Sequence, residues 1–227
     1  MMHSKESRPV FHSAAAQPAH PQVIRRAACR RTSGFVLALT LPLLTAFLSW
    51  TAVAAEGDPT PEEQYFLELL NRSRGNPEAE AARFGIDLNE GSPSPAIKPG
   101  PKPPLAVNLK VLQAARNHLC WMNSGHGSFA HTAKGTIGEH CFTGEGPADR
   151  LAYVDQAHAG WRENLAANHL TDGKAAVERL HEQLFVDAQL AGRVHRVNLL
   201  NDSMNGVGVA FGDASKLPNP GINRGVV

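Results

Sequence analysis

The chain has 227 residues, of which 22 are Lys or Arg and 21 are Asp or Glu, so its formal charge is +1. Residues 1–55 hold six of the basic residues and one of the acids, which leaves 16 basic and 20 acidic side chains in residues 56–227. A mildly acidic domain without a basic stripe gives no support for nucleic-acid binding. The 172 residues after position 55 suffice for one domain with its own hydrophobic core.

The N-terminal extension, residues 1–55, is typical of a secretory signal. Two pairs of arginines within residues 25–31 precede the uncharged run GFVLALTLPLLTAFLSW, which ends in TAVAAEGD. This order predicts cleavage after Ala54 or Ala55 and a secreted, extracellular protein, with the periplasm or the cell surface as alternatives. An uncleaved membrane anchor is the other interpretation, because about 20 apolar residues span a bilayer. Pro42 and the Ala-rich exit favour cleavage.

The first helices have clear start signals. Thr60 can cap a helix over residues 60–75, with Pro61 at its first position and Glu63 completing a capping box. A second short helix is expected at 77–84, where alternating Glu and Ala predict a solvated outer face. The following NEGSPSPAIKPGPKPP, residues 89–104, is a proline-rich loop within the domain.

The second half of the domain mixes helices with short strands. Periodic apolar residues predict three more helices, over 108–123, 147–153 and 174–186. The run GVGVAF, at 206–211, predicts a buried strand that another backbone approaches closely. Early helices and short late strands indicate a mixed α/β or α+β layered domain.

The cysteine count allows one disulfide. Cys29 belongs to the N-terminal extension, which leaves Cys120 and Cys141. In an exported protein these two can pair, and closing a loop of about 20 residues would add roughly 3 kcal/mol. Two unpaired thiols are the alternative.

Three polar positions stand out as candidates for a site. His131 lies in FAHT, Glu163 in WRENLA, and His195 just before an apolar pair in HRVNLLN. Each histidine, taken alone, could be structural, and Glu163 could simply bond backbone amides. Trp161 is expected to anchor the core, and His118 to be solvated on its helix.

These motifs, in this order, resemble the CAP superfamily (cysteine-rich secretory, antigen 5, pathogenesis-related-1; also called SCP-like), in particular its bacterial exported branch. ELLNRSRGNPEAEAARFGIDLNEG, KPPLAVNLKVLQAARNH, FAHT, ENLA and HRVNLLN with GVGVAF carry the resemblance over residues 62–211. It implies an α+β fold, a three-layer α-β-α sandwich around a small, mostly antiparallel sheet. Relatives continue through a final strand that GINRGVV only begins, so a missing last strand and an exposed sheet edge are expected.

The resemblance also implies a cleft in which two histidines and one or two acids converge. It assigns His131 and His195 to the two histidines and Glu163 to the acid of the GEN motif. The second acid has three candidates, of which Glu182 is preferred to His181 and Asp187. Two imidazoles, a carboxylate and a water can hold Zn²⁺, so Zn²⁺ or Ca²⁺ is the expected cofactor. Without a metal, a carboxylate beside an imidazole can exchange protons near neutrality.

Three functions remain open at this level. The first is an exported binding module for a divalent cation or a small apolar, lipid- or sterol-like ligand, or for an extracellular or cell-surface protein. The second is a metal-dependent hydrolase, peptidase- or esterase-like, with Glu163 as base. The third is a truncated, non-functional member. Arg162 departs from the family's usual Gly before the Glu, which places a cation near the cleft or alters a turn.

Overall fold

The computed structural model describes residues 57–93, 97–212 and 223–226. The chain separates into two units, 1–50 and 51–227, and everything below belongs to the second. The predicted signal segment and its cleavage site lie outside the described residues. Within the described ranges, no helix is both long enough and apolar enough to cross a bilayer.

Helices α1 (Pro61–Gly75) and α2 (Pro77–Arg83) begin where the sequence predicts. The capping box is confirmed, because the Thr60 hydroxyl accepts from the Glu63 amide at 3.2 Å and the Glu63 carboxylate accepts from the Thr60 amide at 2.8 Å. The solvated face expected for α2 is wrong at Glu80, which is only 2% exposed. Arg72 of α1 donates to the Glu80 carboxylate at 3.0 Å, so this acid joins the two helices.

Four more helices follow. They are α3 (Leu109–Asn123), α4 (Pro147–Tyr153), α5 (Gly173–Val186) and α6 (Val194–Leu199), with 3₁₀ turns at Glu139–Cys141 and Ala191–Arg193. The first three were expected from periodicity. Helix α6 was not, and it carries His195, so this histidine lies on a helix rather than directly before a strand.

The strands form two small groups. In the first, β1 (Ala106–Val107) pairs in parallel with β3 (Gly206–Val207). The second is an antiparallel sheet in the order β2-β5-β4, and its members are β2 (Leu165–Asn168), β4 (Ala210–Gly212) and β5 (Asn223–Val226). The predicted strand at 206–211 is thus divided into β3 and β4.

The expected loss of the last strand is wrong for this structure. Strand β5 lies between β2 and β4 and pairs with both, so that Val226 faces Leu165 on one side and Ala210 on the other. Strand β5 therefore occupies the centre of this sheet, and β2 and β4 are each paired with it on one side.

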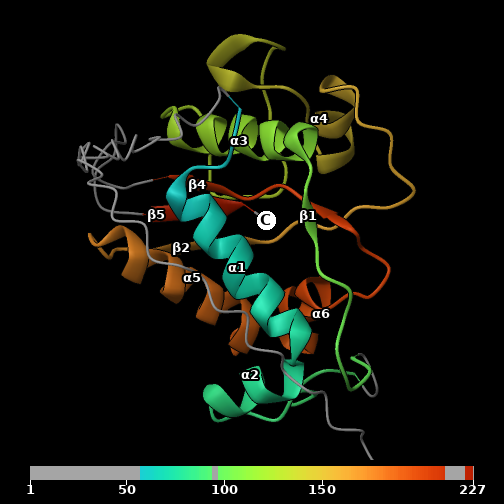
Figure 1. Cartoon of the computed structure of the whole chain (residues 1–227). Coiled ribbons are helices and arrows are strands. Elements are labelled where there is room, and N and C mark those ends of the chain that lie inside the picture. The colour runs from blue at the N-terminus through green and yellow to red at the C-terminus, as the bar shows by residue number, and fades with distance from the viewer. Residues whose placement is uncertain (1–56, 94–96, 213–222, 227) are drawn as a thin grey trace, which may run out of the picture. The chain divides into compact units, whose positions relative to one another are not determined.

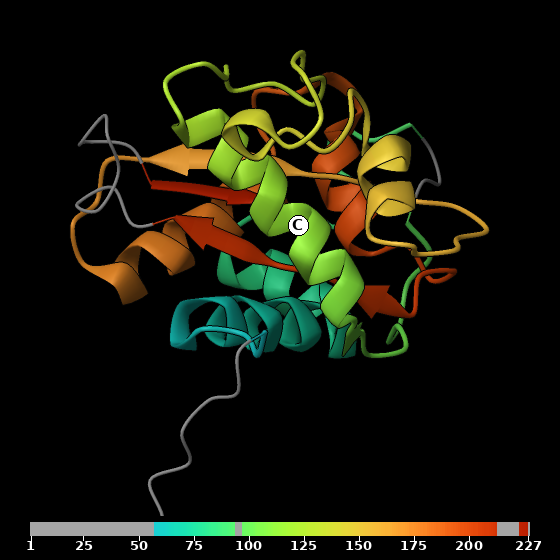
Figure 2. The ribbon, with the colours of Figure 1, turned by 90° about the horizontal axis from the view of Figure 1, so that it is seen from above.

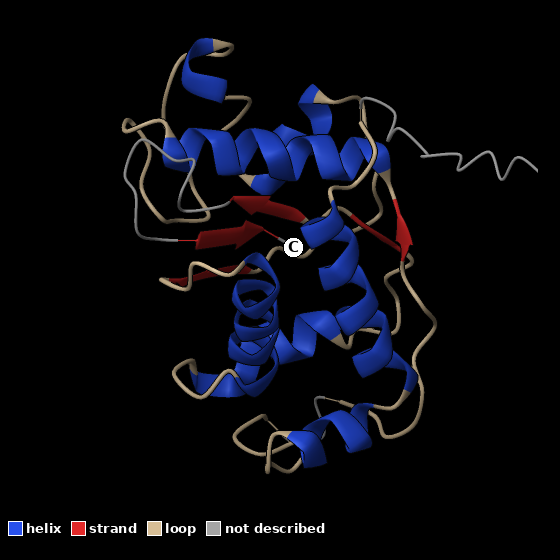
Figure 3. Ribbon diagram, turned by 60° about the vertical axis from the view of Figure 1, so that its left-hand side comes forward, coloured by secondary structure: helices blue, strands red, loops and turns tan. Residues whose placement is uncertain are grey.

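The sheet lies between two helical layers, as Figures 1 and 3 show. Helices α3 and α4 cover one face, and α1, α5 and α6 lie on the other. Seen from above, α3 lies across the strands (Figure 2). One core cluster joins α1 and α5 to the sheet, and a second joins α3 to it, around Leu119 and Met122. The α+β class and the α-β-α arrangement are therefore confirmed.

Gly208 shows why α3 can lie so close to the sheet. A Cβ atom at this position would overlap the backbone of α3 at Val111 and Leu112. Only glycine fits here, so the predicted close approach of another backbone to GVGVAF is confirmed.

Candidate functional site

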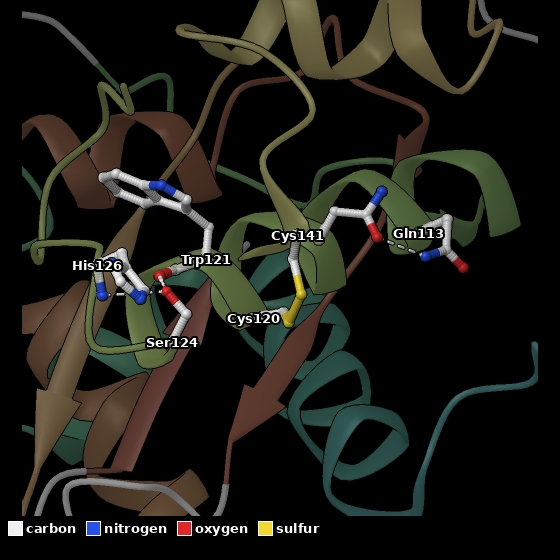
Figure 4. Close-up of a disulfide and its surroundings, with 7 residues drawn as sticks. Gln113, Cys120, Trp121, Ser124, His126 and Cys141 are labelled. Atoms are coloured by element: carbon white, nitrogen blue, oxygen red, sulfur yellow. Dashed lines mark hydrogen bonds between the residues drawn. A yellow bond between two sulfur atoms is a disulfide. The ribbon is translucent and has the colours of Figure 1, made fainter. Parts of the chain in front are cut away.

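The loop after α3 carries His131 and is fixed at several points. A disulfide joins Cys120 of α3 to Cys141, with Cα atoms 5.7 Å apart (Figure 4). Further along, the Ala133 amide donates to the Glu145 carbonyl at 2.8 Å. The 23-residue connection between α3 and α4 is thus joined to α3 by the disulfide and to itself by the backbone hydrogen bond.

His118 also holds this loop, from inside the protein. Its side chain is 1% exposed, so the expectation of a solvated residue is wrong. Its Nε2 lies 3.0 Å from the carbonyl oxygen of Ala130, the residue before His131. A carbonyl only accepts, so Nε2 carries the proton and the buried Nδ1 is the unprotonated nitrogen. Burial, with the charge of Arg150, lowers the pKa of His118 to about 4, so the ring is neutral at pH 7.

Glu163 is the centre of the site. One carboxylate oxygen is 2.9 Å from His131 Nδ1, and the other is 2.7 Å from Arg150 Nη2. The side chains of Glu163 and Arg150 are 9% and 3% exposed. Burial alone would raise the pKa of Glu163, but the hydrogen bond with His131 and the charge of Arg150 outweigh it and lower the pKa. The carboxylate is therefore ionised at neutral pH.

Arg150 is a site residue that the sequence did not reveal. It lies on α4, and besides Glu163 it donates to the carbonyl of His131 at 3.1 Å and to that of Glu145 at 3.2 Å. One guanidinium thus binds the acid and the loop that presents the histidine. Nothing in the local pattern of α4 distinguishes this arginine from a solvated one.

His195 has a different acid as its partner. Its Nδ1 is 2.9 Å from one oxygen of Asp187, and its backbone amide donates to the other oxygen at 2.9 Å. Asp187 is 4% exposed and ends α5 in the left-handed conformation, with φ +49°. Because a carboxylate only accepts, His195 carries its proton on Nδ1, and a neutral ring presents a lone pair on Nε2.

Glu182, the preferred candidate for the second acid, lies elsewhere. It pairs with Arg179 at 2.8 Å on the same helix and lines a separate hollow of 450 Å³ with Phe84 and Leu170. Five positions along a helix correspond to about 140° around its axis, so Glu182 and Asp187 leave α5 in different directions. Asp187, the third candidate, occupies the place beside His195.

Asn164 connects the two histidine–acid pairs. It follows Glu163 directly, and its Nδ2 donates to the carbonyl of His195 at 3.2 Å. Its Oδ1 accepts from Asn198 of α6 at 2.9 Å. The segment that enters β2 therefore contacts the His131 loop through one residue and the His195 helix through the next.

The residues assigned as metal ligands are not gathered at one point in the described part of the chain. Among the described residues, no three His, Cys, Asp or Glu side chains come close enough together to hold a metal ion. Both oxygens of the Glu163 carboxylate already have partners, His131 and the guanidinium of Arg150. His195 donates its Nδ1–H to Asp187, which leaves Nε2 as its free nitrogen.

A cavity of 740 Å³ opens beside this carboxylate. Of the four residues assigned from the resemblance, Glu163 is the one that lines it. Its wall combines aliphatic and polar side chains, among them Val111, Leu151 and Met204 with Asn108, Gln156 and Arg150. Trp161 is also in the wall and is 40% exposed, so the expectation that it anchors the core is wrong.

This fold and these residues define an α-β-α sandwich domain with two histidine–acid pairs. The family model described as CAP, the cysteine-rich secretory protein family, matches residues 67–220, and the chain therefore belongs to the CAP family. The match spans both histidines, both acids and the disulfide. No curated protein and no solved structure matches the chain.

The ion pair between Arg150 and Glu163 leads to a first prediction. Replacing one partner of a buried pair leaves a charge without compensation, so Arg150→Met is expected to lower the free energy of unfolding by about 3 kcal/mol. The double variant Arg150→Met, Glu163→Gln removes both charges and should cost at least 1 kcal/mol less than the sum of the single changes, roughly as coupled neighbours do. Urea unfolding of the unchanged protein, Arg150→Met, Glu163→Gln and the double variant measures this coupling. If the two single costs simply add up to the cost of the double variant, the pairing is contradicted.

Proposed function

We propose that this CAP-family protein is exported and binds a small, partly apolar ligand in the cavity beside Glu163. The cavity carries the proposal. Its volume of 740 Å³ lies within the range of about 300–1,000 Å³ that is usual for small-molecule sites. Its wall combines apolar and polar side chains in similar measure, which suits a ligand that has an apolar part and a polar part.

Export is supported by two observations. Proteins of this family are generally secreted. In addition, Cys120 and Cys141 form a disulfide, a bond that persists in oxidising compartments outside the cytosol. Both agree with the signal-like sequence of residues 1–55.

Hydrolysis is less well supported than binding. A general base works best with a pKa near the operating pH, and the surroundings of Glu163 lower its pKa instead. Both of its oxygens are also engaged, one by His131 and one by Arg150. The residue is better suited to hold the loop and the cavity wall than to take a proton from water.

A neutral apolar dye tests the binding proposal. We expect N-phenyl-1-naphthylamine to bind the purified protein with a dissociation constant of about 10 µM, given typical affinities per ligand atom. The variant Val111→Trp places an indole in the cavity wall and should weaken binding at least roughly tenfold, a loss of about 1.4 kcal/mol. Dye fluorescence during titration measures both constants.

The matched control is Gln113→Trp. This position lies on the same helix, two residues further on, but is exposed and does not line the cavity. It should bind the dye as the unchanged protein does, and circular dichroism checks that both variants are folded. If Val111→Trp binds the dye as tightly as Gln113→Trp, the ligand does not occupy this cavity.

A further inference from the structure

The charges on the cavity wall do not balance. Its charged residues are Arg150, Arg162 and Glu163. Arg150 and Glu163 neutralise each other in their 2.7 Å ion pair. Arg162 remains, so the wall carries one positive charge in excess.

Arg162 has most of its hydrogen-bonding capacity free. Its side chain is exposed, and its Nη1 donates to the carbonyl of Trp161 at 2.7 Å. No carboxylate of the described ranges forms an ion pair with it, whereas the nearby Lys110 and Arg150 each have one. A guanidinium has five N–H donors in a planar fork, which matches a carboxylate or phosphate in a bidentate contact.

The cavity that Arg162 lines also presents apolar side chains. Trp161 presents a partly exposed aromatic surface next to the guanidinium. Val111, Leu151 and Met204 line the same cavity with aliphatic groups. A ligand with an apolar chain and an anionic end would satisfy both parts at once.

We propose that the cavity selects anionic amphiphiles, and that Arg162 is the residue that determines this specificity by binding their carboxylate or phosphate group. This inference rests on the proposed function and specifies its ligand class.

Chain-matched competitors test the inference. Decanoate, decyl phosphate, decanol and decylamine share one apolar chain and differ in the charge of the head. Each is titrated against bound N-phenyl-1-naphthylamine at pH 7.5. We expect the two anions to displace the dye at concentrations about fivefold lower than decanol, and decylamine to be the weakest, because one exposed ion pair contributes up to about 1 kcal/mol. The ratio of decanoate to decyl phosphate shows which anionic group is preferred.

Variants of Arg162 identify the residue responsible. Arg162→Gln should bring the affinities of decanoate and decanol to within about twofold of each other, each calculated with the dye affinity of the same variant, and Arg162→Lys should retain part of the preference. Arg179→Gln is the control, since this exposed arginine lies in the other hollow. Raising the salt concentration from 50 to 500 mM should also shrink the preference, because ions screen an exposed charge.

The outcomes separate the two proposals. If the dye does not bind at all, the binding function itself fails. If the dye binds but decanoate and decanol compete equally well, or if Arg162→Gln keeps the anion preference, the cavity binds ligands and the assignment of Arg162 is overturned.

Discussion

Lowering the pH from 7.5 to 4.5 is expected to reduce the free energy of unfolding by about 5 kcal/mol, through two buried histidines. His118 and His181 are each 1% exposed, and each has its pKa lowered from 6.5 to about 4. In the unfolded chain both rings take up protons below pH 6.5, whereas in the folded protein they stay neutral until about pH 4. The unfolded state therefore binds more protons in this window, and stability falls as the pH falls.

The surroundings of each ring explain these shifts. Burial is the main cause for both. Arg150 disfavours a charge on His118, while Glu163 only partly compensates. Around His181, Glu80 favours the charged ring, but Arg72 and Arg83 oppose it. His181 Nε2 lies 2.7 Å from the Ser73 hydroxyl, and this serine is fully buried, so the cluster of Ser73, His181 and Glu80 is structural.

Urea midpoints at pH 7.5, 6.5, 5.5 and 4.5 measure the effect. His181→Leu should be destabilised by about 1–2 kcal/mol at pH 7.5, because it loses the bond to Ser73 and some packing. Between pH 7.5 and 4.5, the free energy of unfolding of His181→Leu should fall by about half as much as that of the unchanged protein, because one of the two titrating rings is gone. The control His158→Leu, at an exposed position, should show the same decrease in the free energy of unfolding as the unchanged protein. An unchanged pH dependence in His181→Leu would contradict the assignment.

The helices with local signals could be predicted from the sequence. Thr60 and Glu63 specify the start of α1 through atoms only three residues apart, so the sequence contains the whole interaction. Helix α6 lacks such signals. It is short and follows Gly192 and Arg193, both with positive φ, a combination that is typical of a turn. Its position depends on packing against α5.

The sequence located only those residues of the candidate site that belong to the ordered motifs. The resemblance located His131, Glu163 and His195. In the structure, His131 pairs with Glu163 and His195 pairs with Asp187. The partners themselves depend on tertiary packing: Arg150 reaches Glu163 from helix α4. Asp187 had a local signal that could have favoured it over Glu182. It follows the last residue of a predicted helix, where aspartate readily takes the left-handed conformation that ends the helix. That turn brings it to His195, eight residues later.

Side-chain exposure was the property that was predicted least accurately from the sequence. Trp161 was expected inside and is partly exposed, while His118 and Glu80 were expected outside and are buried. Residue type gives only an average preference, and tertiary partners override it. Glu80 is buried because two arginines neutralise it, and Trp161 is exposed because it borders a cavity.

The largest effect of a single substitution is expected at Arg196, next to His195 on α6. Its side chain is fully buried, and burial lowers the pKa of its guanidinium. Among the described residues, no carboxylate forms an ion pair with it, although the charges of Glu90 and Asp187 favour the charged guanidinium. Instead it donates five hydrogen bonds to backbone carbonyls, those of Phe185, Val186, Asp87, Leu88 and Glu90. One side chain thus joins the end of α5 to the loop after α2 and holds α6 between them.

Arg196→Met is expected to lower the free energy of unfolding by about 4 kcal/mol, because five carbonyls lose their donor in a place that water reaches poorly. Arg196→Lys should recover little, since one ammonium cannot reach carbonyls on both segments. Arg74, which is equally buried and donates to four carbonyls, provides an independent test of the same argument. Arg179→Met, at a half-exposed surface pair, should stay within about 0.5 kcal/mol of the unchanged protein. Urea unfolding ranks these variants, and a cost below about 1 kcal/mol for Arg196→Met would show that the carbonyls find other donors.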